Sequence, residues 1–241
     1  MRKNTYPIRN RAYTVNMDHH KTSNVPNQDA SNRSILAYFD GLYSSNYQKG
    51  ETIINGVEEP KGIYLIKEGY VKAYSISTMG QSNLLIIHST GDFIPLPWAL
   101  DGEQSSDLYY EAMSNVIVIR SSKSNLRSTM GKDPWLSQEV FKKAVSIIES
   151  YTKRIQTLEF RTAEGKVISE LLNLAVRFGK TTLKGTLIEA PITHQDIADS
   201  LNMVRETVSR TIEKLIAQNL IEQINHSFVL TDVVKLRAAV E

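Results

Sequence analysis

Two arginines and a glutamate, Arg205, Glu206 and Arg210, lie close together near the C-terminus. The surrounding residues 192–220 have the apolar spacing of two short helices joined by a tight turn. Asn202 sits at this turn, and Asn tolerates the left-handed backbone conformation better than most residues. The three charged side chains then face outward from the first turns of the second helix. This pattern predicts a helix-turn-helix whose second helix enters the major groove of DNA.

The composition excludes several classes of protein. The 241-residue chain is 41% hydrophobic and contains no cysteine, which removes disulfides, thiolate metal sites and cysteine-ligated iron–sulfur clusters. Its apolar runs are shorter than the roughly 20 residues of a membrane helix, and the polar N-terminus lacks a secretory signal, so we expect a cytoplasmic protein. Net charge gives little support for a nucleic-acid partner, because residues 161–241 hold ten basic and ten acidic residues.

The first part of the chain divides at about residue 35. Residues 1–34 are polar, and we expect a disordered tail. The alternative is a basic arm that contacts DNA phosphates through its arginines and lysines: Arg2, Lys3, Arg9 and Arg11. Residues 35–131 are short β-rich runs separated by turn residues about every ten positions, which is typical of an antiparallel sandwich or barrel.

Residues 132–160 are expected to form one long helix. Asp133 and Pro134 suit its N-cap and first position. Apolar residues then recur at alternating steps of three and four: Phe141, Ala144, Ile148, Tyr151, Ile155 and Leu158. Such a helix either packs on the β-rich domain or self-associates. The strict spacing favours a parallel homodimer, whose two-fold symmetry suits a palindromic DNA site.

Residues 161–241 are expected to form a second domain around the helix pair. The pattern predicts a helix over 163–179 that ends at Gly179, a hairpin or wing over 221–230, and a short last helix from about Thr231.

Several motifs resemble those of a known family. The most specific are Ile192-Thr-His-Gln-Asp-Ile-Ala198, Arg205-Glu-Thr-Val-Ser-Arg210 and Gln218-Asn-Leu-Ile221; weaker ones are Lys49-Gly-Glu-Thr-Ile53 and Gly91-Asp-Phe93. Over about residues 40–230 the chain resembles the cyclic-AMP receptor protein and fumarate-nitrate regulator (Crp/Fnr) superfamily of bacterial transcription factors. The resemblance implies an α+β fold, with an N-terminal β-roll (a cyclic-nucleotide-binding-like jelly roll), a long dimerisation helix and a C-terminal winged helix-turn-helix.

The resemblance also implies roles for individual residues. Arg205 and Arg210 would donate to guanine O6 and N7, and Glu206 would accept from cytosine N4, in TGTGA-like half-sites repeated as an inverted pair. RNA polymerase is an implied partner of the regulator. Val204 stands where the family often has Ser. Phosphate contacts are expected from four residues: Thr193, His194, Gln195 and Ser209.

The sensor half departs from the family's cyclic-nucleotide binders, which hold the cyclic phosphate with an arginine. The sequence has no arginine between Lys72 and Arg120, so cyclic AMP or GMP bound in the usual mode is not expected. We expect no cofactor and no metal, and either another effector or none. A haem-based gas sensor with His88 as ligand is an alternative. The apolar bend at 95–98 indicates a candidate effector pocket: Tyr74, Ile94, Leu96, Trp98 and Tyr110.

Two further alternatives belong to other classes of protein. A cupin-like enzyme fused to a DNA-binding domain needs clustered histidine ligands, typically two one residue apart, and residues 40–130 contain only His88. The sequence also lacks a phosphate-binding loop, a nucleophile elbow and paired catalytic acids, so we expect no catalytic residues. The other alternative is that the helix pair binds a protein rather than DNA.

Overall fold

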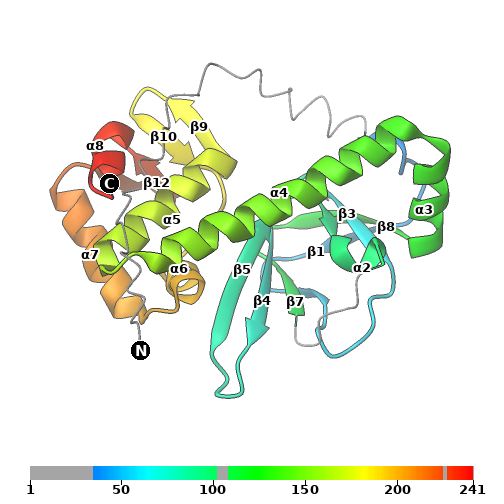
Figure 1. The fold of residues 1–241 in the computed structure, drawn as a ribbon, viewed down its shortest axis with the longest axis horizontal. Coiled ribbons are helices and arrows are strands. Elements are labelled where there is room, and N and C mark those ends of the chain that lie inside the picture. The colour runs from blue at the N-terminus through cyan, green and yellow to red at the C-terminus, as the bar shows by residue number, and fades with distance from the viewer. Residues whose placement is uncertain (1–34, 102–107, 225–226, 241) are drawn as a thin grey trace, which may run out of the picture.

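The computed structural model describes residues 35–101, 108–224 and 227–240 (Figure 1). The predicted tail and its basic arm, residues 1–34, lie outside this range, as do the turn residues 225–226 of the predicted wing. In the described part of the chain, no helix is long and apolar enough to cross a membrane. The same residues contain no cluster of three or more His, Asp or Glu side chains that could hold a metal ion.

Two antiparallel four-stranded sheets form the N-terminal domain, as the β-roll prediction requires. One sheet has the order β1 (Ser44–Tyr47), β8 (Val116–Ser121), β3 (Ile63–Glu68), β6 (Phe93–Ile94). The other has the order β2 (Thr52–Ile54), β7 (Leu108–Ala112), β4 (Val71–Ile76), β5 (Ser82–His88). In β4, Val71 and Ala73 are buried while Lys72 and Tyr74 are half-buried on the other face, as side-chain alternation dictates. The inner faces of the two sheets therefore enclose an apolar core.

This half of the molecule also contains the helices α2 (Leu96–Ala99), α3 (Lys123–Lys132) and α4 (Pro134–Glu159). Helix α4 begins as predicted, with the Asp133 carboxylate accepting hydrogen bonds from the backbone N–H groups of Trp135 and Leu136 at 2.8 and 3.3 Å. It extends from α3, along the sheets, to the C-terminal domain (Figure 1). Helix α3 was not predicted from the sequence. Only Leu126 of α3 is buried, so the segment lacks the apolar period of a helix that packs one face on a core.

The C-terminal domain is a winged helix-turn-helix, as predicted. Helix α5 (Ala163–Phe178) leads into the hairpin β9 (Gly179–Thr182) and β10 (Gly185–Ile188). The helix pair α6 (His194–Leu201) and α7 (Arg205–Ala217) follows, then β11 (Ile221–Ile224), β12 (Ser227–Leu230) and α8 (Val233–Ala238). The strands form a third antiparallel sheet with the order β11–β12–β10–β9, which is the wing.

The two domains share one hydrophobic cluster. Leu84 and Ile87 of β5, together with Met113, pack in the same cluster as the buried residues of α5, α6 and α7. Each of these three side chains is at most 5% exposed. The C-terminal domain therefore packs against β5 through apolar contacts, in addition to its covalent connection to α4.

Candidate nucleic-acid interface

The turn between α6 and α7 has the geometry that the sequence predicts. Asn202 adopts the left-handed conformation, with φ 52° and ψ 49°. The backbone N–H of Met203 donates to the Ala198 carbonyl at 2.9 Å, closing the end of α6. Because Asn pays a smaller penalty than other side chains in this conformation, Asn202 lets the chain reverse without a glycine. The turn fixes the direction in which α7 leaves α6.

Helix α7 separates a buried face from a charged exposed face. Val208, Ile212 and Leu215 are fully buried against the domain core. Arg205, Glu206 and Arg210 are exposed at the start of the helix. Among the described residues none of these three side chains forms an ion pair, and Arg210 Nε donates to the Glu206 backbone carbonyl at 3.3 Å. Their donors and acceptors are therefore directed to solvent rather than to each other.

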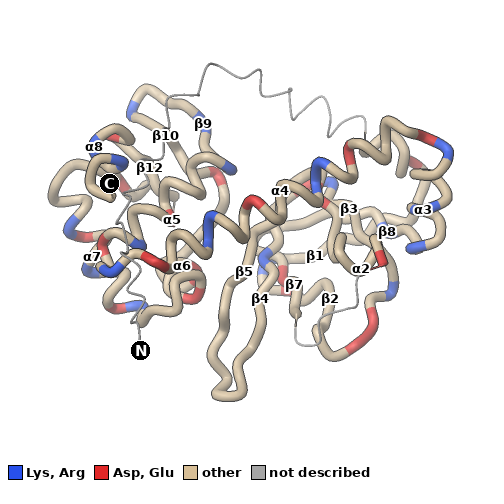
Figure 2. Tube along the Cα trace, viewed as in Figure 1, with Lys and Arg blue, Asp and Glu red and all other residues tan. Residues whose placement is uncertain are grey.

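Charge is mixed over the C-terminal domain as a whole. Basic and acidic positions alternate along α7 and over the neighbouring elements, without a single-sign face in this view (Figure 2). The equal counts of ten basic and ten acidic residues in residues 161–241 give the same result. Affinity for a polyanion must therefore depend on the positions of individual basic side chains rather than on net charge. Helix α7 has two such side chains, the arginines near its N-terminal end.

The N-terminus of α6 is held by a reciprocal pair of side chains. The Thr193 hydroxyl accepts from the Asp196 backbone N–H at 3.1 Å, while the Asp196 carboxylate accepts from the Thr193 backbone N–H at 2.9 Å. Gln195 is exposed, and its amide donates to Asp199 at 2.6 Å. Lys72 of β4 reaches the Asp196 carboxylate at 3.6 Å, so a strand of the β-roll contacts this helix end. Thr193 and Gln195 lie at the surface where a phosphate would approach.

The structure joins His194 and Ser209, two of the predicted phosphate contacts, to each other. Nδ1 of His194 lies 2.9 Å from the Ser209 hydroxyl, which ties α6 to α7. The imidazole stacks on Phe228 of the wing, with 5.8 Å between ring centroids. Nε2 is buried and has no hydrogen-bond partner among the described residues. Burial is the main reason that the pKa of His194 lies below its ordinary value. His194 therefore carries a neutral ring that connects α6, α7 and the wing.

The predicted dimer seam on α4 divides into two faces. Ala144 and Tyr151 pack against the protein's own β-roll. Phe141, Ile148 and Ile155, spaced seven residues apart, are 68%, 63% and 60% exposed, and Leu158 is half-buried. One face of α4 therefore packs on the β-roll, as one interpretation of the sequence expects, and an apolar strip faces solvent; self-association through that strip stays a prediction.

The five predicted effector-pocket residues lie in different surroundings. Ile94 and Tyr110 are buried in the cluster between the sheets, and Leu96 is buried in a second cluster beside α4. Trp98 is half-buried and lies under the Lys123 ammonium, 4.9 Å from the ring centroid. Tyr74 borders a cavity of about 680 Å³ at the edge of the roll. The apolar bend is thus part of the folded core.

His88, the candidate haem ligand, is a core residue. It is 4% exposed, and Nδ1 lies 3.8 Å from the Asp92 carboxylate. Desolvation outweighs this carboxylate and lowers the pKa of His88 to about 4, so the ring is neutral. His88 does not line the cavity at the roll edge or the smaller one at the domain junction.

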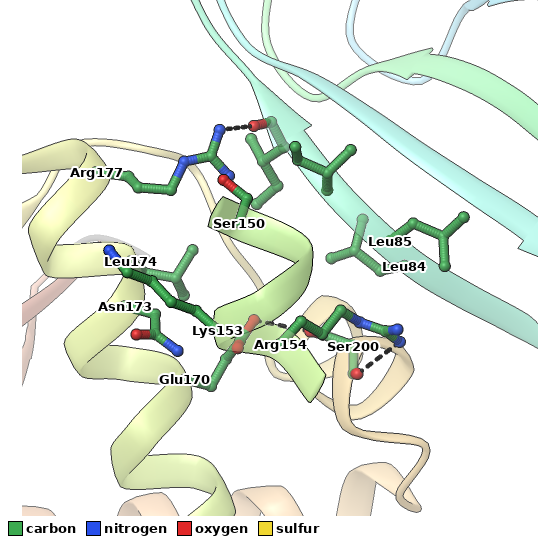
Figure 3. Close-up of a pocket in the computed structure, with 12 residues that line it drawn as sticks. Leu84, Leu85, Ser150, Lys153, Arg154, Glu170, Asn173, Leu174, Arg177 and Ser200 are labelled. Atoms are coloured by element: carbon green, nitrogen blue, oxygen red, sulfur yellow. Dashed lines mark hydrogen bonds between the residues drawn. The ribbon is translucent and has the colours of Figure 1, made fainter. Parts of the chain in front are cut away.

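A polar cluster at the domain junction was missed from the sequence. Nη2 of Arg154 in α4 donates to Asn83 Oδ1 of β5 at 2.6 Å. The same nitrogen donates to the Ser200 carbonyl of α6 at 2.9 Å (Figure 3). Arg177 of α5 donates to the Ile87 carbonyl of β5 at 2.6 Å. Arg154 and Arg177 border a cavity of about 50 Å³. The sequence feature that could have indicated this cluster is the presence of arginines in otherwise apolar helical patterns. Their hydrogen-bond partners, however, are distant in the sequence.

Glu170 of α5 completes this cluster. It is buried, and the Ser200 hydroxyl donates to its carboxylate at 2.7 Å. Burial raises the pKa of Glu170, and the Ser200 bond and the nearby Arg154 and Arg177 offset this only in part. The cluster thus joins β5, α4, α5 and α6 through buried polar bonds.

Comparison with known proteins agrees with this architecture. The model of the Crp-like helix-turn-helix domain matches residues 165–239, and that of the cyclic nucleotide-binding domain matches residues 44–133. Electron transport regulator A of Shewanella oneidensis is 27% identical over 187 residues, which cover 77% of this chain and 73% of that protein.

Two further relatives extend the comparison. The fumarate and nitrate reduction regulatory protein of Vibrio cholerae is 26% identical over 165 residues, covering 68% of this chain and 65% of its own length. The structure of a CooA mutant from Carboxydothermus hydrogenoformans superposes with a TM-score of 0.71 at 19% identity, over 85% of this chain and 90% of that one. The superposition covers the β-domain, the long helix and the helix-turn-helix of most of the chain, so the fold is shared with that structure. The chain belongs to the Crp/Fnr family of DNA-binding transcription regulators, which are not enzymes.

Proposed function

We propose that the protein is a homodimer that reads an inverted-repeat DNA site through α7. The observation that carries this proposal is the face of α7: two exposed arginines and a glutamate, unpaired with one another, at the start of a helix whose opposite side is fully buried. Arg205 and Arg210 have the forked donors that suit guanine O6 and N7, and Glu206 has the acceptor that suits cytosine N4. TGTGA-like half-sites follow as the expected target.

The exposed strip of α4 supports the dimer. Phe141, Ile148 and Ile155 leave most of their apolar surface in water in the single chain. A heptad-spaced strip of this kind is covered when two copies pair along the helix. Parallel pairing relates the two α7 helices by a two-fold axis, so that each can enter a major groove one helical turn, about 34 Å, from the other.

Regulation is proposed to come from a ligand other than a cyclic nucleotide, or from no ligand. The space between the sheets and α4, where a ligand would touch both, is occupied by Tyr110, Ile147 and Tyr151. The alternative of a haem sensor finds no supporting observation, because His88 is enclosed in the core. The regulator would act in the cytoplasm, with RNA polymerase as its partner in transcription.

Selection from a randomised DNA library tests the proposed readout. The wild-type protein should enrich an inverted repeat with G·C pairs in each half. Arg205→Ala should relax preference at one G·C pair per half-site, at a cost of about 1–3 kcal/mol per contact. Arg237→Ala, which removes an exposed arginine from α8, is the matched control and should keep the preference. An unchanged base preference in Arg205→Ala would refute the assignment.

A further inference from the structure

A cavity at the edge of the β-roll has no role in the proposed DNA readout. Its volume is about 680 Å³, within the range of roughly 300–1,000 Å³ typical of small-molecule sites. It opens beside the two edge strands β1 and β2. Five tyrosines and an arginine border it: Tyr43, Tyr47, Tyr64, Tyr74, Tyr109 and Arg120.

One wall of this cavity combines rings with a guanidinium. Arg120 of β8 is the cross-strand partner of Tyr64 in β3, so the two side chains lie on the same face of the sheet. The guanidinium carbon lies 5.5 Å from the centre of the Tyr43 ring. Burial, and then the neighbouring Tyr64, raise the pKa of Tyr47, while Arg120 lowers it, which places Tyr47 in the same group. No ion pair joins Arg120 to a carboxylate of the described residues, so its forked donors are available to a ligand.

Other residues of the lining supply a flat aromatic surface. The rings of Tyr74 and Tyr109 are stacked, with centroids 5.5 Å apart and an angle of 20° between planes. The Tyr74 hydroxyl donates to Glu111 at 3.3 Å, which fixes the ring. Aromatic faces of this kind favour a planar ligand, because offset stacking adds to the apolar contact.

The charges around the cavity limit the charge of the ligand. Lys61 adds a second positive group to Arg120, while Glu58 and Glu59 border the same cavity on the loop that follows β2. The lining therefore carries both signs of charge, and one negative group of a ligand can pair with Arg120. Arginine pairs a carboxylate in a planar, bidentate manner, which suits a carboxylate attached to a ring.

We propose that this cavity binds a small aromatic carboxylate, with the ring against the tyrosines and the carboxylate on Arg120. The site differs from the enclosed space between the sheets and α4, which Tyr110, Ile147 and Tyr151 fill. Binding itself does not depend on the proposed DNA readout; only the role of the ligand as an effector rests on that function.

Calorimetric titration of the full-length protein with three probes tests the proposal. The probes are 2-naphthoate, its neutral analogue 2-naphthamide, and cyclohexanecarboxylate, which keeps the charge and lacks the aromatic ring. We expect 2-naphthoate to bind more tightly than both others. Arg120→Gln should weaken the binding of 2-naphthoate by about tenfold or more, as expected for the loss of hydrogen bonds to a charged group. The same substitution should leave the affinity for 2-naphthamide unchanged. Arg237→Gln, on the distant α8, is the control and should bind as the wild type does.

The alternatives are separated by the same titrations. No binding of 2-naphthoate, equal binding of all three probes, or equal losses in Arg120→Gln and Arg237→Gln would each overturn the proposal. DNA affinity measured with and without saturating 2-naphthoate then tests the effector role. Binding of the probe with unchanged DNA affinity refutes the effector role alone. A protein that binds the probe and shows no specific DNA binding refutes the proposed DNA function and leaves the site intact.

Discussion

Ile148 is the residue whose replacement tests the dimer most directly. It lies at the centre of the exposed strip on α4 and is 63% exposed in the single chain. Complete burial of such a side chain stabilises by about 1.5–3 kcal/mol, so covering the exposed part contributes roughly 1.3 kcal/mol per protomer. A two-fold interface contains Ile148 twice. Ile148→Ala should therefore weaken the dimer by up to about 2.5 kcal/mol, or about 60-fold in its dissociation constant.

Sedimentation equilibrium over a range of protein concentrations measures this constant. Alanine has a higher helix propensity than isoleucine, so the substitution does not weaken α4 itself. Val176→Ala is a matched control, because Val176 is 62% exposed on α5 and lies outside the strip. We expect Val176→Ala to dimerise as the wild type does. If Ile148→Ala changes the dissociation constant no more than Val176→Ala, or if the wild type is monomeric, then the strip is not the dimer interface.

Three further predictions concern stability. Burial lowers the pKa of His88 to about 4, below the ordinary value of about 6.5. The contribution of neutral His88 to the free energy of unfolding is therefore present above pH 6.5, and about 3 kcal/mol of it is lost as the pH falls towards 4. Urea unfolding at several pH values should show that His88→Gln lacks this part of the pH dependence. Ser200→Ala removes a hydrogen-bond donor from buried Glu170 and should lower the free energy of unfolding by about 1–3 kcal/mol. Ser146→Ala, at an exposed site, is the control and should leave the free energy of unfolding unchanged. Equal effects of the two substitutions would exclude a special role for the buried hydrogen bond. Val204→Ser supplies the side-chain cap that α7 lacks and should raise the free energy of unfolding by about 1 kcal/mol, and an unchanged or lower thermal midpoint would contradict this.

The helix pair could be predicted because its determinants are local in sequence. Asn202 provides the left-handed turn, and the apolar spacing of α7 places Val208 and Ile212 inward, which leaves Arg205 facing outward. The N-cap of α4 at Asp133 was predictable for the same reason. In each case the relevant partners lie within a few residues of one another, so periodicity and residue type are sufficient.

The remaining features depend on contacts between distant residues. Heptad spacing identifies one side of α4, but it does not show that Tyr151 packs on the protein's own roll while Ile148 faces solvent. His194 has a residue type suited to phosphate contact, yet its ring is engaged by Ser209 of α7 and by Phe228 of the wing. The tyrosine-lined cavity is assembled from strands spread over the whole β-domain, so its sequence pattern resembles that of ordinary strands.

The shared hydrophobic cluster limits how regulation can work. Swinging the C-terminal domain off β5 would expose Leu84, Ile87 and Met113, at about 1.5–3 kcal/mol each, or roughly 5–9 kcal/mol in all. The hydrogen bond from Arg177 of α5 to the Ile87 carbonyl of β5 would be broken as well, as would the one from Arg154 of α4 to the Ser200 carbonyl of α6. A ligand shifts such an equilibrium only by its differential affinity, and about 5.5 kcal/mol requires roughly 10⁴-fold tighter binding to one state. In the proposed dimer, a small, weakly bound effector would therefore act more readily on the packing between the two α4 helices, and each C-terminal domain would stay packed on its own β5.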